Sequence, residues 1–362
     1  MDAPLLSIDN LRVSFSTGEG NVQALRGVSF SLNAQEVLGV VGESGSGKSV
    51  TALAIMGLLA KNAQVDGSIK LRGEEILGLS ERELTKVRGR LVAMIFQDPL
   101  TSLNPVYNIG WQVAEAVQAH RDLSKDEARA EAVRLLHMVG IPRAESRVND
   151  YPHEFSGGMR QRVVIASAMA NDPQVILADE PTTALDVTVQ AQVLESLKTA
   201  LDETKASLVL ITHDLGVIAG LADRVIVMYA GRIVEIGAAE DIFYRPAMPY
   251  THGLLGSVPR VDDDGGGRLR QIPGAPPSLI GQAKGCPFAP RCPLRADICT
   301  EREPDLVAIV SGVASEATPG PRNTETTQPH LAACHFANQV TSMPVASMFP
   351  DSSSDHEVPA QS

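Results

Sequence analysis

The sequence predicts an α/β fold built around a mostly parallel sheet. Short apolar runs recur at residues 37–41, 92–96, 175–178, 208–212 and 225–229. Continuous runs of this kind are typical of strands that are buried on both faces. Helical patterns lie between them, at residues 49–59, 125–139 and 187–203. This alternation of strand and helix is the pattern of βαβ units.

Antiparallel features accompany the parallel sheet. Residues 6–15 and 24–32 resemble paired antiparallel strands, and Ala230-Gly231 reads as a tight hairpin turn before residues 232–236. From about residue 251 the amino-acid composition changes. An acidic, glycine-rich linker at residues 262–267 is followed by a segment rich in proline and turn-forming residues. We therefore expect one α/β domain over residues 1–255, a small irregular cysteine-containing domain over 256–336, and a disordered tail over 337–362.

Composition and charge restrict the classes of function. The chain has 362 residues, of which 44% are apolar and 20% are charged, as in a globular protein with more than one domain. The formal net charge of −12 argues against a nucleic-acid partner, since phosphate backbones select for Lys and Arg. We find no apolar run of the roughly 18 residues that span a bilayer, and no pattern of a signal peptide. These features predict a cytoplasmic protein that reaches a membrane only through another subunit.

A glycine-rich motif at Gly42–Ser49 fits the pattern G-x-x-x-x-G-K-[ST] of a phosphate-binding loop. It follows a predicted strand and opens a predicted helix, which disfavours the alternative of a glycine-rich turn that happens to contain Lys. The backbone N–H groups and the helix N-terminus attract phosphate oxygens. Lys48 should bridge the β- and γ-phosphates, and the Ser49 hydroxyl should ligate Mg²⁺. The residues expected to contact the nucleotide are Gly42, Ser44, Gly45, Gly47, Lys48, Ser49 and Val50.

Two carboxylates end the apolar run at residues 175–178. Asp179 is placed to reach Mg²⁺ beside the loop, and Glu180 is placed to accept a proton from an attacking water. The alternative is a solvated acidic pair at the end of a strand. The loop upstream favours the functional interpretation.

Polar residues also follow two other predicted strands. His213 could contact the γ-phosphate and position the water, or it could be a capping or core His. Gln97 could reach Mg²⁺ or the water, or it could be an ordinary loop residue. Because open α/β sheets bind ligands at the carboxyl ends of their strands, we expect these groups to converge on one edge.

A second glycine-rich segment, Ser156-Gly157-Gly158, opens another predicted helix that reaches about residue 170. With this segment the set of motifs resembles the ATP-binding cassette (ABC) family. The matching segments are Walker A at Gly42–Ser49, the Q-loop at Gln97, the signature at Ser156-Gly157-Gly158, Walker B ending at Asp179-Glu180, the D-loop at Ala184-Leu185-Asp186 and the H-loop at His213. Met159 departs from the Gln found in many members, but the Ser and both glycines are intact.

The resemblance implies an ABC nucleotide-binding domain with an antiparallel N-terminal subdomain and a helical signature subdomain. It also implies a pair of cassettes, in which the signature of one, with Asp186 of its D-loop, closes over the ATP held by the other. Phe15 lies where the family places an aromatic that stacks on adenine. The alternative for Phe15 is a core side chain on an edge strand.

Longer stretches resemble the ATPase subunits of bacterial oligopeptide, dipeptide and nickel importers, among them FQDPLTSLNPVYNIG, YPHEFSGGMRQR and PYTHGLLGSVP. The resemblance implies an ATP-hydrolysing subunit bound to two transmembrane permeases, beside a second and usually different cassette chain, with an extracytoplasmic substrate-binding protein. It implies a position at the cytoplasmic face of the cell membrane. Oligopeptides or dipeptides are the expected cargo, and nickel or another small solute is the alternative.

Other classes of ABC protein fit the motifs less well. A soluble ATPase of DNA maintenance needs a long coiled-coil insertion, and the interval between Gln97 and Ser156 is too short for one. A translation-associated protein with two fused cassettes needs a second signature. A non-hydrolysing partner cassette is expected to lack Glu180 or His213, and a binding-only cluster protein has no need of the Walker residues.

Four cysteines, Cys286, Cys292, Cys299 and Cys334, lie in the C-terminal region. Their spacing fits neither a zinc ribbon nor the ferredoxin patterns, although four thiols in a poorly hydrophobic segment still suggest a metal. Members of the importer group carry this cysteine pattern, and the resemblance implies a [4Fe-4S] cluster with all four as ligands. Zinc, free thiols and disulfides remain alternatives, and His330 or His335 could substitute as a ligand.

Overall fold

The computed structural model describes residues 3–18, 20–183, 185–257, 271–281, 284–309, 329–345 and 348–349. The predicted linker at residues 262–267 and Ala184 of the D-loop lie outside these ranges. No helix within them combines the length and the apolar character that a bilayer span requires.

The larger sheet has the strand order β11-β12-β10-β9-β3-β8-β7-β6. Its strands are β3 (Val37–Val41), β6 (Val92–Ile95), β7 (Val175–Asp179), β8 (Ser207–Ile211), β9 (Arg224–Tyr229), β10 (Arg232–Ala238), β11 (Val307–Ala308) and β12 (Leu331–Ala332). The pairs β6–β7, β7–β8, β8–β3 and β3–β9 are parallel. The five apolar runs of the sequence therefore form the parallel part of this sheet, as predicted.

The smaller sheet is antiparallel, with the order β2-β1-β4-β5. Its strands are β1 (Leu6–Thr17), β2 (Gly20–Leu32), β4 (Ala63–Leu71) and β5 (Glu74–Glu75). The predicted pairing of the first two strands is confirmed, and the predicted hairpin turn joins β9 to β10, where Tyr229 pairs with Arg232.

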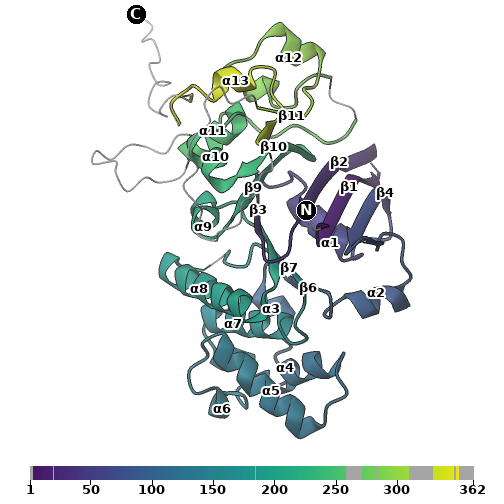
Figure 1. Ribbon diagram of the computed structural model, residues 1–362, viewed down its shortest axis with the longest axis vertical. Coiled ribbons are helices and arrows are strands. Elements are labelled where there is room, and N and C mark those ends of the chain that lie inside the picture. The colour runs from purple at the N-terminus through teal and green to yellow at the C-terminus, as the bar shows by residue number, and fades with distance from the viewer. Residues whose placement is uncertain are drawn as a thin grey trace, which may run out of the picture.

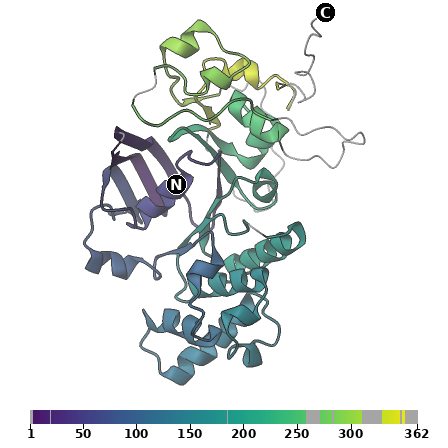
Figure 2. The same cartoon turned by 180° about the vertical axis from the view of Figure 1, so that it is seen from behind.

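Helices cover the larger sheet and form a separate lobe at one end of the molecule (Figures 1 and 2). In chain order the first nine are α1 (Lys48–Ile55), α2 (Glu81–Val87), α3 (Pro99–Ser102), α4 (Ile109–Gln118), α5 (Lys125–Met138), α6 (Ala144–Arg147), α7 (Gly157–Ala168), α8 (Val187–Thr204) and α9 (Leu215–Ala219). Side chains cap the starts of α4 and α5: Asn108 accepts from the Trp111 N–H, and Ser124 forms a capping box with Glu127. We call α4 to α7 the helical lobe.

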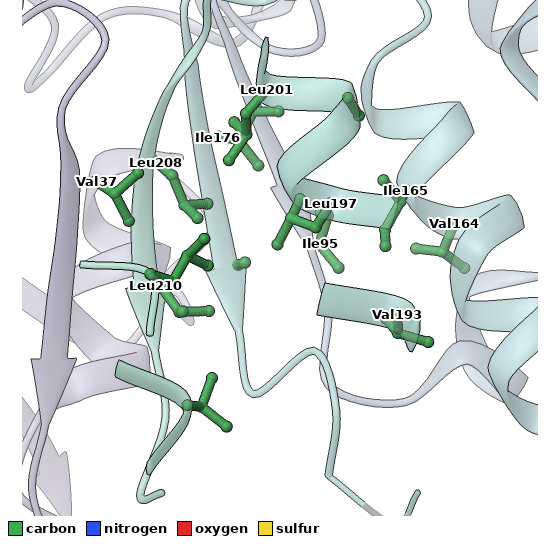
Figure 3. Close-up of a cluster of buried hydrophobic side chains, with 14 of the residues drawn as sticks. Val37, Ile95, Val164, Ile165, Ile176, Val193, Leu197, Leu201, Leu208 and Leu210 are labelled. Carbon is green, nitrogen blue, oxygen red and sulfur yellow. The ribbon is translucent and has the colours of Figure 1, made fainter. Parts of the chain in front are cut away.

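The core between sheet and helices is apolar on both sides (Figure 3). Val37, Ile95, Ile176, Leu208 and Leu210 come from the strands and are fully buried. They face a second set from α7 and α8, which consists of Val164, Ile165, Val193, Leu197 and Leu201. Burying each of these side chains contributes about 1.5–3 kcal/mol. The parallel strands are apolar on both faces because a second core lies on the other side of the sheet, where β3, β7 and β8 contribute Leu38, Leu177 and Val209.

The C-terminal region continues the larger sheet. It contains α10 (Ala239–Tyr244), α11 (Pro249–Gly256), α12 (Asp297–Glu301) and α13 (Ala337–Val340), with a short 3-10 turn at Ala289–Arg291. Strand β12 pairs with β10 through Glu235 and Ala332, so the cysteine-containing region is joined to the sheet by backbone hydrogen bonds. The region lies at the end of the molecule opposite the helical lobe (Figures 1 and 2).

The prediction of a disordered tail from residue 337 is wrong for its first residues. Helix α13 buries Ala337 and Val340, and Phe349 is only 3% exposed. These side chains are ordered because they find apolar neighbours in the fold, such as Ala247 and Ala332 beside Ala337. Residues 350–362 lie outside the described residues.

Candidate functional site

Four strand ends bring the predicted polar residues to one edge of the sheet. The adjacent parallel strands β3, β8, β7 and β6 lead into Gly42, His213, Asp179-Glu180 and Gln97. The expectation that these groups converge on the carboxyl edge is confirmed by their mutual contacts, which the following paragraphs describe.

The loop Gly42–Gly47 joins β3 to the start of α1. Gly42 has a φ of 151°, and a Cβ atom there would lie 2.2 Å from the Met228 carbonyl oxygen. Only glycine fits such a position. The loop thus runs against β9, and its curl places Lys48 at the first turn of α1.

Lys48 is held inside the loop. Its side chain is 5% exposed, and Nζ donates to the carbonyl oxygens of Gly42 at 2.7 Å and of Glu43 at 3.0 Å. Burial lowers the pKa of Lys48, while the nearby carboxylates of Glu180, Asp179 and Glu43 act in the opposite direction. A desolvated ammonium at this position is prepared to exchange loop carbonyls for phosphate oxygens.

Ser49 and Asp179 meet across the sheet edge. The Ser49 hydroxyl donates to Oδ1 of Asp179 at 3.0 Å, and Asp179 is 8% exposed. Burial raises the pKa of Asp179, although the Ser49 hydrogen bond and Lys48 act in the opposite direction. Two oxygen donors beside a phosphate-binding loop suit Mg²⁺, which is usually held by one or two carboxylates together with substrate phosphates. The residues present therefore fit this ion.

Glu180 turns away from Asp179 to a different set of partners. Its φ of 48° lies in the left-handed region, where its N–H donates to the Ile211 carbonyl oxygen at 2.8 Å. A non-glycine residue in this region is strained, and such strain concentrates at functional sites. The turn aims the Glu180 side chain toward the ends of β6 and β8.

Three donors surround the Glu180 carboxylate. Its Oε2 accepts from the Thr183 hydroxyl at 2.7 Å and from Nε2 of Gln97 at 3.0 Å, and Nδ1 of His213 lies 3.4 Å away. Burial by itself raises the pKa of Glu180, but the Thr183 hydrogen bond and His213 outweigh it and hold the pKa below its usual range. An ionised carboxylate held by three donors can accept a proton from water.

The structure thus joins Gln97, Glu180 and His213 in one cluster. Gln97 and His213 are both exposed, so the cluster opens to solvent at the sheet edge. The contact predicted between Gln97 and Mg²⁺ remains a prediction. Thr183 received no role in the sequence analysis, although it lies three residues after Glu180. Its only signal was its place between Walker B and the D-loop, which does not reveal where its hydroxyl points.

Phe15 lies on β1, which pairs with β2 on one side and β4 on the other. It is therefore not on an edge strand, as the alternative interpretation supposed. Its ring is partly buried against the second core. The stacking role on adenine remains a prediction.

The signature residues start α7. The Ser156 side chain caps the helix at the Met159 N–H, and a Cβ atom on Gly158 would lie 2.3 Å from Cγ1 of Val189 in α8. Asp186 caps α8 in turn by accepting from the Val189 N–H at 3.0 Å. Close packing of α7 on α8 thus requires glycine at 158.

The signature and the phosphate-binding loop lie in different parts of the molecule. In both views α7 belongs to the lower half with the helical lobe, whereas α1 lies in the upper half beside the antiparallel sheet (Figures 1 and 2). This arrangement fits the expectation that the signature serves a nucleotide bound by another cassette.

The four cysteines are free thiols. Burial raises the pKa of Cys286, raises that of Cys292 to about 11 and raises that of Cys334 to about 12, and neighbouring thiols add to each shift. All four sulfurs therefore lie within electrostatic range of one another. No three His, Cys, Asp or Glu side chains of the described ranges are close enough to share a single metal ion.

The two histidines that could replace a cysteine ligand have other partners. Nε2 of His330 lies 2.8 Å from Oε1 of Glu235, and Nε2 of His335 lies 2.9 Å from the Arg302 carbonyl oxygen. The donor set that remains is four thiols, a set that can hold an iron–sulfur cluster or Zn²⁺.

Two family models match the chain. One, described as ABC transporter, matches residues 25–183, and one, described as the C-terminal region of oligopeptide/dipeptide transporters, matches residues 234–299. The Oligopeptide transport ATP-binding protein OppD of Escherichia coli is 54% identical over 300 residues, which are 83% of this chain and 89% of that protein. This chain belongs to the ABC transporter family. The resemblance found from the motifs is confirmed.

Further ABC relatives agree with this assignment. The Dipeptide transport ATP-binding protein DppD of Bacillus subtilis is 54% identical over 82% of this chain and 88% of its own length. OppD of Mycobacterium tuberculosis is also 54% identical over 85% of this chain, but the chain spans only about half of that relative, 51%.

Solved ABC structures confirm the fold class. A dimeric structure of the ATP-binding cassette MJ0796 bound to ADP and Pi has a TM-score of 0.58 and 29% identity, and it covers 65% of this chain and 98% of that one. CbiO1 from Clostridium perfringens, part of the transporter complex cbiONQ, has a TM-score of 0.58 and 26% identity, and it covers 67% of this chain and 91% of that one.

Proposed function

We propose that this chain is the ATP-hydrolysing subunit of an importer for oligopeptides or dipeptides. The proposal rests on one observation: Lys48, the Ser49–Asp179 pair and the Glu180 cluster lie together at one edge of the sheet. The names of the relatives, which are oligopeptide and dipeptide transport ATP-binding proteins, support the cargo.

Each residue of the edge has a task in hydrolysis. The loop N–H groups and Lys48 bind the phosphates of ATP, and Ser49 and Asp179 hold Mg²⁺, which when bound neutralises charge that develops on the phosphates. Glu180 accepts the proton of the attacking water, since its carboxylate is ionised at neutral pH. His213 and Gln97, both beside that carboxylate, orient the water and the γ-phosphate. Phe15 stacks on the adenine.

The active unit is a pair of cassettes placed head to tail. Ser156, Gly157 and Gly158, with Asp186 nearby, close over the ATP held by the partner cassette, because their place on α7 and α8 is remote from α1 of the same chain. The dimeric state in which the cassette MJ0796 was solved supports a pair of cassettes. We propose a second, different cassette chain as the partner.

Two permeases anchor the pair at the cytoplasmic face of the membrane. The surface after Gln97 suits docking, since Val106 is 70% exposed and the stacked rings of Tyr107 and Trp111 are 43% and 44% exposed. Exposed apolar side chains gathered on one surface mark interaction sites. Closure of the cassette pair, transmitted through this docking surface, couples the state of ATP to the transport path of the permeases. An extracytoplasmic binding protein delivers the cargo.

Reconstitution tests the transport function. The chain, its partner cassette and both permeases are placed in liposomes that enclose Mg-ATP, with the binding protein and a labelled oligopeptide or dipeptide outside. Uptake should depend on ATP and should be lost in Lys48→Ala. Uptake of Ni²⁺ without either peptide would reassign the cargo, and ATP turnover that moves no solute would contradict the transport function.

We propose that Cys286, Cys292, Cys299 and Cys334 together ligate a [4Fe-4S] cluster with a structural role. The support is that the four thiols act electrostatically on one another and that four thiolates are a ligand set that such clusters use. Anaerobically purified chain should show absorbance near ~400 nm and about four irons per chain, as cluster ligation by four thiolates requires. Zinc without iron would overturn this assignment.

A further inference from the structure

The cysteine-containing region reaches into the phosphate-binding loop through one side chain. Arg291, adjacent to Cys292, forms a bidentate ion pair with Glu43, the second residue of the loop. Its Nη1 lies 2.6 Å from Oε2 of Glu43, and its Nη2 lies 2.9 Å from Oε1. The Arg291 side chain is only 5% exposed, so solvent screens this pair weakly.

Three further acceptors, besides Glu43, hold the Arg291 guanidinium in place. Nε donates to the Pro273 carbonyl oxygen at 2.9 Å, Nη1 to the Tyr229 hydroxyl at 3.3 Å and Nη2 to the Ile272 carbonyl oxygen at 3.3 Å. Its guanidinium carbon also lies 5.9 Å from the ring centroids of Tyr229 and Phe288. A guanidinium with each of its nitrogens engaged is pre-organised for two parallel bonds to a carboxylate.

Glu43 is fixed in the loop in the same way. Its N–H donates to the hydroxyl of Tyr250 at 2.8 Å, and its carbonyl oxygen accepts from Nζ of Lys48 at 3.0 Å. Tyr250 is fully buried and packs on Tyr229, so the same aromatic group contacts both ends of the ion pair. The main chain of Glu43 therefore cannot move without disturbing Lys48 or this aromatic group.

The negative charge of Glu43 is unfavourable for binding phosphates at the loop. Its carboxylate acts electrostatically on Lys48, so it lies close to the place where phosphates bind. An unpaired carboxylate there would repel a polyanionic nucleotide. Arg291 cancels that charge from a region outside the sequence motifs of the site.

We propose that Arg291 is a positioning residue for ATP: it neutralises Glu43 and ties the conformation of the phosphate-binding loop to the cysteine-containing region. The inference rests on the proposed function, since it concerns ATP binding at the same loop. It makes the C-terminal region part of the nucleotide site through the contact of Arg291 with Glu43.

A double-mutant cycle on the full chain tests the proposal. Arg291→Ala should raise the Kd of the chain for Mg-ATP roughly ten-fold, within the range usual for coupling between two sites, while kcat of the assembled pair at saturating ATP stays within about two-fold. In the Glu43→Gln background the same Arg291→Ala change should alter Kd by less than about two-fold, because no charge is left to neutralise. Arg291→Lys, which keeps the charge, should fall between.

Two controls separate this effect from misfolding. Arg295→Ala removes an exposed arginine from the same region and should leave Kd unchanged. Thermal unfolding of every variant reports lost stability directly. If Arg291→Ala weakens ATP binding equally with Glu43 and with Gln at position 43, Arg291 acts only on the structure and the proposal is overturned. Unsubstituted chain that fails to bind ATP would instead overturn the proposed function itself.

Discussion

The hydrogen bonds that the Glu180 carboxylate accepts determine its protonation state. Burial would raise its pKa, and the Thr183 hydroxyl and His213 reverse that effect. The balance keeps Glu180 ionised at pH values where a buried glutamate would be protonated. Thr183 is therefore the residue whose removal most simply reports on the base.

Thr183→Val removes the hydrogen bond and keeps the shape of the side chain. Since this contact lowers the pKa of Glu180, its loss raises that pKa, and less carboxylate is ionised at any given acidic pH. The acid limb of kcat should therefore move to higher pH. The measurement is kcat against pH for the assembled pair with saturating Mg-ATP.

Thr199→Val is the matched control, since Thr199 is exposed and donates only to the Glu195 carbonyl oxygen within α8. Its profile should overlay that of the unsubstituted chain. An unmoved acid limb in Thr183→Val would show that Glu180 does not set that limb.

The residues of the site differ in how far the sequence reveals them. Lys48, Ser49, Asp179 and Glu180 could be predicted because their motif spacing fixes them to a strand end or a helix start. Arg291 could not, because its partner Glu43 is more than two hundred residues away in the sequence, and pairing at that range depends on tertiary packing. Thr183 could not be assigned because its role depends on a side-chain direction.

At the scale of elements, the base of the parallel sheet contains a buried ion pair. Nη1 of Arg224, at the start of β9, lies 2.6 Å from Oε1 of Glu36, which directly precedes β3, and both side chains are 3% exposed. A buried pair of this kind adds little over apolar packing, but breaking it leaves an uncompensated charge. The junction of β3 and β9 supports the loop that follows β3.

Arg224→Met should therefore reduce the free energy of unfolding by about 3–5 kcal/mol, because Glu36 is left charged and buried. Urea denaturation followed by circular dichroism measures the loss. Arg134→Met breaks the half-exposed pair with Glu131 and should cost less than about 1 kcal/mol. Equal losses in the two variants would refute the argument from burial.

The elements that could be predicted were those with strong periodicity or continuous apolar runs, such as β3, β7 and α8. The short pair β11 and β12 could not be predicted, since each has two residues and forms only by adding to the edge of β10. Helix α13 escaped prediction for the same reason: its four residues are ordered by partners elsewhere in the fold and not by their own pattern.

At the scale of the whole molecule, the two segments that we propose to act on nucleotides lie at different places. The phosphate-binding loop lies near the antiparallel sheet, and the signature lies at the start of α7 in the helical lobe (Figure 1). Under the proposed function, binding and hydrolysis are separable within one chain: its own loop would bind a nucleotide, and its signature would act on the nucleotide of the partner.

Ser156→Arg places a bulky charge at the exposed N-terminus of α7. The isolated chain should bind ATP as before, within about two-fold, because the substitution lies away from its own loop, whereas turnover of the assembled pair should fall at least ~10-fold. Ser146→Arg, an exposed change in the helical lobe, is the control and should affect neither quantity. Weaker ATP binding by the isolated Ser156→Arg chain would mean that the signature serves its own nucleotide.

Proton acceptance by Glu180 is the central step of the proposed hydrolysis. Glu180→Gln keeps the shape of the side chain and removes its charge, so ATP binding should persist while turnover by the assembled transporter falls at least ~100-fold, as expected for loss of a general base. Parallel measurement of the Kd for Mg-ATP and of phosphate release decides the matter. Intact binding with turnover near that of the unsubstituted protein would contradict the account, because the water would then be activated by some other group.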